Sequence, residues 1–108
     1  MKKSLAGVAA VAVAAGAFAV PAFAASKTVQ VKDNKFVANS ITVSKGTTVK
    51  WVWKGKAPHD VTVIKGPAKF KSSVKTSGSF SKKLTKTGTY QLVCTIHAPG
   101  MKMTIKVK

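Results

Sequence analysis

The sequence contains very little negative charge, no arginine and only one cysteine. Asp33 and Asp60 are its only acidic residues, against 19 basic side chains that are all lysine, in a chain of 108 residues. A lone Cys94 excludes an intramolecular disulfide framework and any zinc ribbon built on paired cysteines. Because base reading and bidentate phosphate binding favour arginine, its absence argues against a nucleic acid partner.

The N-terminal segment differs in composition from the rest of the chain. Lysines at its start precede an uncharged run over 5–20, rich in Ala, Val and Gly, which Pro21 ends. Ala22 and Ala24 then stand two positions apart, as in a signal-peptidase site. We predict that Met1–Ala24 is a secretory signal peptide, cleaved after its last residue, and that the protein is periplasmic or secreted. The uncharged stretch from Leu5 to Ala25 is also long enough to span a bilayer, so an uncleaved anchor is the alternative.

Residues 25–108 have the length of one small domain. They carry 17 lysines against two aspartates, which gives a formal charge of +15. A charge so far from zero attracts acidic partners and speeds their encounter. Because copies of such a chain repel one another, we expect a monomer.

Apolar residues alternate with polar ones through most of this domain. This period of two is typical of strands with one face in a core and the other in water. Glycine, proline and asparagine turns separate the segments, and no sustained helical period follows residue 25. We predict an all-β fold, a Greek-key β-sandwich or barrel of seven to eight strands. The inward positions are Val29 and Val31, Ile41 and Val43, Val49, Trp51 and Trp53, Val61 and Val63, Tyr90 and Leu92, and Met101, Met103, Ile105 and Val107.

Four side chains that bind soft metals occupy two segments of the sequence. Cys94, His97 and Met101 lie close together near the C-terminus, and His59 follows a turn between two predicted strands. Two imidazoles, a thiolate and a weak thioether form the ligand set of a blue copper site. Such a set suits both Cu(I) and Cu(II), so an electron passes with little rearrangement. These four residues are the candidate ligands of one copper ion.

The sequence around these residues resembles the cupredoxins, the type 1 blue copper proteins. Residues 88–101, GTYQLVCTIHAPGM, are similar to the C-terminal copper loop of that family, and APHDV at 57–61 is similar to its first-histidine segment. The resemblance covers essentially all of the domain and is nearest to plastocyanin-like members such as amicyanin and pseudoazurin. It implies that His59, Cys94 and His97 bind copper in one plane, with Met101 as the axial ligand.

Several features depart from the common cupredoxin pattern, among them the length of the loop after His97 and the residue at position 60. Three residues separate His97 from Met101, where amicyanin-like loops have two and plastocyanin-like loops have four. Asp60 stands where most members carry asparagine, which ties the first-histidine loop to the residue after the cysteine. We expect Asp60 to accept a hydrogen bond from the Thr95 hydroxyl and to make the same link.

The resemblance implies a carrier of single electrons and not an enzyme. The lysine excess predicts an acidic redox partner, such as a cytochrome or an oxidoreductase, or an anionic membrane surface. One alternative is a copper-trafficking or copper-resistance protein that uses the same ligands. Another is an enzyme with Cys94 as nucleophile and a histidine as base, although only Asp60 is evident as an orienting acid. A copper oxidase would need more histidines than the chain has.

Overall fold

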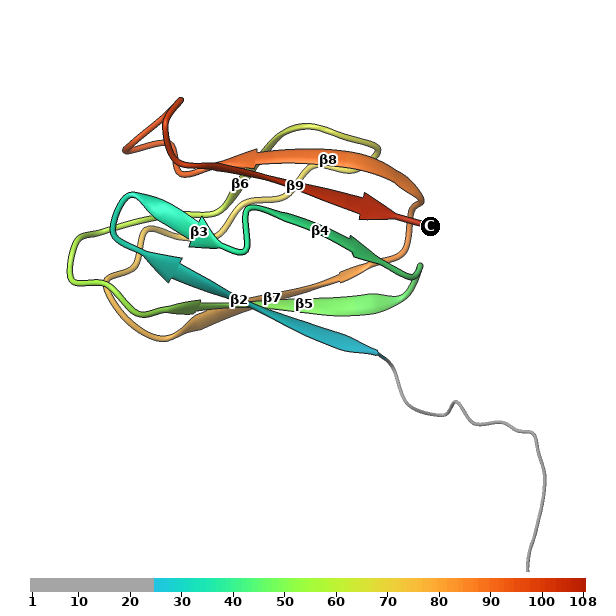
Figure 1. The fold of residues 1–108 in the computed structure, drawn as a ribbon, viewed down its shortest axis with the longest axis horizontal. Helices are drawn as coiled ribbons and strands as arrows, with labels where there is room; N and C mark the ends of the chain where they lie inside the picture. The colour runs from blue at the N-terminus through green and yellow to red at the C-terminus, as the bar shows by residue number, and fades with distance from the viewer. Residues whose placement is uncertain (1–24) are drawn as a thin grey trace, which may run out of the picture.

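The structure, a computed structural model, describes residues 25–108, and the predicted signal peptide lies outside them. Eight strands form two four-stranded sheets that face each other, as Figure 1 shows. This confirms the predicted all-β sandwich. Within the described residues, no helix has the length and hydrophobicity that a membrane span requires.

The first sheet has the strand order β3-β2-β5-β7. Strand β2 pairs antiparallel with β3 and parallel with β5, and β5 pairs antiparallel with β7. The parallel pair places Val31 opposite Trp53, so the turn after β2 lies beside the end of β5. The bounds are Ser26–Lys32 for β2, Lys35–Val37 for β3, Thr47–Trp53 for β5 and Ser79–Leu84 for β7.

The second sheet has the strand order β4-β9-β8-β6. Strand β9 pairs parallel with β4 and antiparallel with β8, which in turn pairs antiparallel with β6. Each sheet is therefore mixed, with one parallel pair. The bounds are Ser40–Val43 for β4, Thr62–Lys65 for β6, Gly88–Val93 for β8 and Lys102–Val107 for β9.

The core between the sheets is made by the residues that the period of two predicts. All of the predicted inward residues are buried except Val43, which is partly exposed. Trp51 lies fully buried, and its indole N–H donates to Met103 Sδ at 3.3 Å. Tyr90 donates its hydroxyl to the Lys86 carbonyl, and burial raises the pKa of this hydroxyl. Each such buried side chain contributes about 1.5–3 kcal/mol to folding.

Residues 66–78 connect the two sheets and are mostly irregular. This segment runs beside the chain that leads into β6. The Val61 N–H donates to the Ser72 hydroxyl at 2.9 Å, and His59 forms an isolated bridge with Lys75. The connection thus holds the His59 segment against the sandwich, a contact that the sequence pattern did not predict.

Three connections meet at one end of the sandwich. The β2–β3 turn, the β5–β6 loop and the β8–β9 loop all lie at the left of Figure 1, opposite the C-terminus. These connections contain Asp33, His59 and the segment 94–101, respectively. The fold therefore brings the candidate ligands to a single end of the molecule.

Candidate metal centre

Cys94 lies directly after β8 and is fully buried. Its backbone N–H donates to the Met101 carbonyl at 3.0 Å, and its carbonyl accepts from the His97 N–H at 3.1 Å. The Met101 N–H in turn donates to the His97 carbonyl at 3.2 Å. These bonds close the β8–β9 loop and join the backbones of three candidate ligands.

His59 reaches the same place from the β5–β6 loop and is fully buried. It exchanges two backbone hydrogen bonds with Lys75, both at 2.9 Å. The Trp53 indole N–H also donates to the His59 carbonyl, at 3.1 Å. Hydrogen bonds within the protein therefore fix the backbone of this histidine from two sides.

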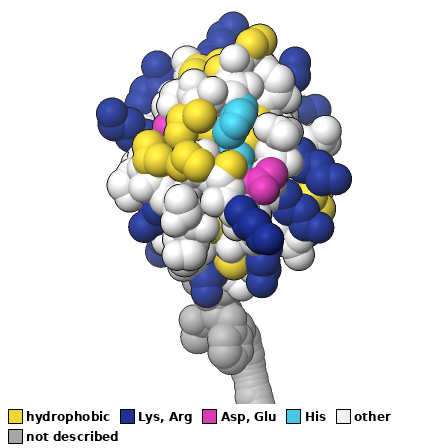
Figure 2. Space-filling view, turned by 90° about the vertical axis from the view of Figure 1, so that its left-hand side faces the viewer, with side chains coloured by type: hydrophobic (Ala, Val, Ile, Leu, Met, Phe, Trp, Pro, Cys, Tyr) yellow, Lys and Arg dark blue, Asp and Glu magenta, His cyan; other side chains and the backbone are white. Residues whose placement is uncertain are grey.

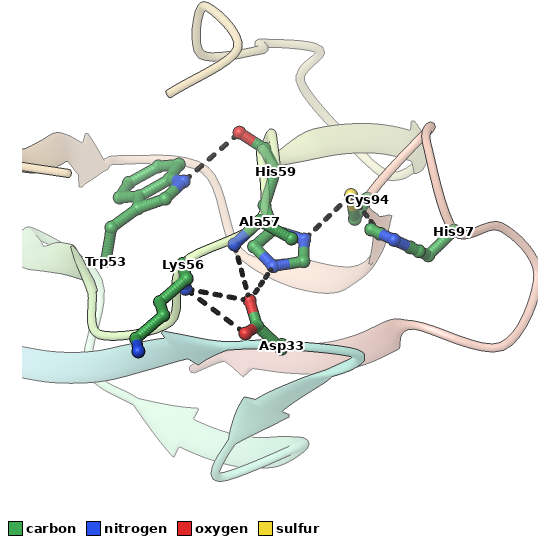
Figure 3. A network of polar contacts seen from close by, with 7 residues as sticks. All are labelled: Asp33, Trp53, Lys56, Ala57, His59, Cys94 and His97. Carbon is green, nitrogen blue, oxygen red and sulfur yellow. Dashed lines mark hydrogen bonds and ion pairs between the residues drawn. The ribbon is translucent and has the colours of Figure 1, made fainter. Parts of the chain in front are cut away.

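The donor atoms of three candidate ligands converge (Figure 3). Nδ1 of His59 lies 3.7 Å from the Cys94 Sγ, and Nδ1 of His97 lies 3.6 Å from it. One ligand atom from each of these residues lies within 4.8 Å of the others. The fourth candidate, Met101, is buried at the end of the same loop. A buried thiol faced by two imidazoles, with a thioether residue in the loop, fits copper in chemical type.

Asp60 links the two loops that carry the candidate ligands. Its Oδ1 accepts from the Thr95 N–H at 2.8 Å, and its Oδ2 accepts from the Thr95 hydroxyl at 2.5 Å. This confirms the hydrogen bond predicted between Asp60 and the Thr95 hydroxyl. Because Asp60 follows His59 and Thr95 follows Cys94, the link ties the two ligand segments together.

Asp33 contacts the site, although the sequence analysis gave it no role there. Its Oδ1 lies 2.9 Å from the His59 Nε2, as Figure 3 shows. The same carboxylate accepts from the N–H groups of Lys56, at 3.1 Å, and Ala57, at 3.0 Å. The hydrogen bond with His59, followed by those from the two backbone groups, lowers the pKa of Asp33 to about 2. The scarcity of acidic residues was the only signal that marked Asp33 in the sequence.

His97 is the candidate ligand that reaches the surface, since it is only partly buried. Figure 2 looks onto this end of the molecule and shows a histidine edge beside apolar side chains, with lysines around the face. Ile96 is 47% exposed, and Pro58, Ala98 and Pro99 are also exposed. We call these four residues with His97 the apolar rim.

Comparisons with known proteins point to the same kind of site. Residues 24–108 match the profile of the copper binding proteins of the plastocyanin/azurin family. An oxidised amicyanin variant is similar, with 28% identity over 77% of this chain and 82% of that one, and a TM-score of 0.68. A Cu(I) form of another amicyanin variant has 29% identity over 80% and 90% of the two chains, and a TM-score of 0.69. No curated protein sequence matches.

The chain therefore belongs to the plastocyanin/azurin family of copper-binding proteins. This family membership confirms the cupredoxin resemblance of the sequence, and copper is the cofactor. The chain is therefore a blue copper electron-transfer protein in class, and the similar structures described above are those of amicyanin.

Proposed function

We propose that this protein carries single electrons between protein partners in the periplasm, with one copper ion held by His59, Cys94, His97 and Met101. The observation that carries the proposal is the approach of two imidazole Nδ1 atoms to one buried thiol, at 3.7 and 3.6 Å. Copper bound to such donors supplies exchange of one electron between Cu(I) and Cu(II). The predicted signal peptide supports the periplasmic location.

The side chains of the chain itself have distinct tasks in this proposal. Cys94, His59 and Met101 are buried and keep solvent from the donor atoms. The partly exposed His97 gives a partner protein a contact next to the site. We expect no substrate to be transformed, because the Cys94 thiol is fully buried and is therefore poorly placed to attack one.

The first experiment is a visible absorption and EPR spectrum of the protein after addition of Cu(II). We expect an intense thiolate-to-copper band with a narrow copper hyperfine splitting in the EPR spectrum. The Cys94→Ser variant replaces the thiol with a hydroxyl group in a side chain of similar size and shape. It should lose the thiolate-to-copper band. A pale Cu(II) complex of the unmodified protein would contradict the ligand assignment. Rapid loss of copper to a chelator would favour trafficking over electron transfer.

We propose that partners dock on the apolar rim and are acidic. Residues 25–108 carry 17 lysines against two aspartates, and both aspartates accept internal hydrogen bonds, so the charge that a partner meets is predominantly positive. Lysines bring an acidic partner toward the molecule, and a small apolar contact lets it leave again.

Ferricyanide, an anionic one-electron oxidant, tests this docking face. Ala98→Glu places a negative charge in the apolar rim and should slow oxidation of the Cu(I) protein several-fold at low salt, with an unchanged visible spectrum. Salt should reduce the difference, because ions screen exposed charges. Thr89→Glu makes the same charge change at the exposed far end of β8 and should have a smaller effect. Equal slowing by both variants would place docking elsewhere.

A further inference from the structure

The Asp33 side chain, which is outside the ligand set, makes a direct contact with the imidazole ring of a candidate ligand. The Asp33 carboxylate lies 2.9 Å from the His59 Nε2, on the opposite side of the imidazole ring from the Cys94 thiol. His59 is fully buried, whereas the Asp33 side chain is 44% exposed. Asp33 therefore reaches a buried ring from the surface.

This contact determines which ring nitrogen of His59 carries a hydrogen. An ionised carboxylate only accepts hydrogen bonds, so the His59 Nε2 must be the donor. The neutral ring then presents a free lone pair at Nδ1, the atom that faces the Cys94 Sγ at 3.7 Å. Asp33 thus favours the tautomer that a metal at this position requires.

The Asp33 carboxylate is itself held in place. The backbone N–H groups of Lys56 and Ala57 donate to it, and these residues belong to the same loop as His59. Gly55 makes this approach possible, because a Cβ there would lie 2.2 Å from the Asp33 Oδ1 and 2.8 Å from the Asp33 backbone nitrogen. The Lys54 N–H also donates to the Val31 carbonyl, at 2.8 Å, which joins the two loops at their bases.

We propose that Asp33 is a positioning residue for the copper ligand His59. It holds the ring in the Nε2-protonated tautomer and strengthens Nδ1 as a donor toward Cu(II). Carboxylates placed in this way behind metal-binding histidines orient the ring and raise its basicity. The inference rests on the proposed assignment of His59 as a ligand.

Asp33→Ala removes both the acceptor and its charge. Loss of such a contact costs roughly 10–100-fold in metal affinity, and we expect a loss in this range for Cu(II). Because Cu(I) needs the added basicity less, the reduction potential should rise, by about 59 mV for each tenfold loss that falls on Cu(II) alone. Asp33→Asn keeps an oxygen acceptor for the His59 N–H and should show a smaller change in both quantities.

The experiment uses the apo, Cu(I) and Cu(II) forms of the protein and its variants. Two-bond ¹⁵N–¹H correlation NMR of the His59 ring in the apo protein reports the tautomer without any metal. Voltammetry gives the reduction potential, and chelator competition gives the Cu(II) affinity. Asn34→Gly is the matched control, because glycine adopts the φ of 69° found there and the Asp33 carboxylate stays in place.

The expected result is one Nε2-protonated tautomer in the unmodified protein, in Asp33→Asn and in the control, and a mixture in Asp33→Ala. If Asp33→Ala keeps both this tautomer and the original potential, the inference is wrong, even if the variant is less stable. If Asp33→Ala does not fold, the reduction potential of Asp33→Asn tests the inference instead. A potential equal to that of the unmodified protein would show that the charge of Asp33 has no effect on the copper. Absence of the thiolate band in the unmodified protein would refute the ligand assignment as well.

Discussion

The two carboxylates of residues 25–108 each secure one part of the copper site, and their surroundings are opposite. Asp60 is only 6% exposed, is adjacent to His59 in sequence and bonds to the residue after Cys94. The Asp33 side chain is 44% exposed and lies 26 positions from the histidine that it contacts. One carboxylate therefore joins two loops inside the protein, and the other orients a ring from the surface.

This difference predicts that one carboxylate acts mainly on the free energy of unfolding and the other mainly on the reduction potential of the copper. A buried carboxylate that accepts two hydrogen bonds leaves unpaired donors behind when it is removed. The position of a half-exposed carboxylate such as Asp33 lies at the surface, where water can take its place as the acceptor. We therefore expect Asp60 to contribute mainly to folding and Asp33 mainly to the properties of His59.

The largest expected effect is that of Asp60→Ala on the free energy of unfolding. The variant leaves the Thr95 N–H and hydroxyl without their acceptor, so we expect a loss of about 3 kcal/mol. Denaturant titration of the apo protein measures it, with Asp33→Ala as the comparison that should lose less. Equal losses in the two variants would remove the distinction between the buried and the exposed carboxylate.

A second prediction tests the close approach of Asp33 to the β5–β6 loop. In Gly55→Ala the new methyl group overlaps the Asp33 carboxylate and its backbone nitrogen, so one of the two loops must move. We expect a loss of about 1–3 kcal/mol in the free energy of unfolding, typical of overpacking. The reduction potential should also rise, because the carboxylate retreats from His59.

Gly100→Ala is the matched control in the other ligand loop. The new Cβ there meets only the His97 carbonyl oxygen, at an ordinary distance of 3.6 Å. Thermal unfolding and voltammetry of both variants should show a clear change for Gly55→Ala and little for Gly100→Ala. If the two glycine variants behaved alike, the tight contact with Asp33 would have no special role.

The same comparison shows which parts of the site the sequence reveals. Strand β5 follows from the alternation of Val49, Trp51 and Trp53, because burial of one sheet face imposes a period of two. The link between Asp60 and Thr95 was predictable from the cupredoxin resemblance, which implies a bond between the residue after the first histidine and the residue after the cysteine. These contacts depend on the order of neighbouring residues in the sequence and on the approach of only two loops.

The Asp33 contact depends instead on a pairing between distant strands. Asp33 meets the His59 loop because β2 lies parallel to β5 with Val31 opposite Trp53. Nothing in the local pattern specifies this partner or this register, which follow from the packing of the whole sandwich. The bridge between His59 and Lys75 was missed for a similar reason, since residues 66–78 have no periodic pattern.

The smallest expected change in stability is that of Asp60→Asn, which tests the charge of the buried carboxylate alone. The amide oxygen can accept from the Thr95 N–H, and the amide NH₂ can donate to the Thr95 hydroxyl oxygen, so both links persist. Loss of a negative charge near the site disfavours Cu(II), and we expect the reduction potential to rise by tens of millivolts. Voltammetry measures the shift, and the thiolate-to-copper band shows that the ligands are unchanged. An unchanged or lower potential would mean that Asp60 acts only through its hydrogen bonds, which would leave Asp33 as the carboxylate that tunes the metal.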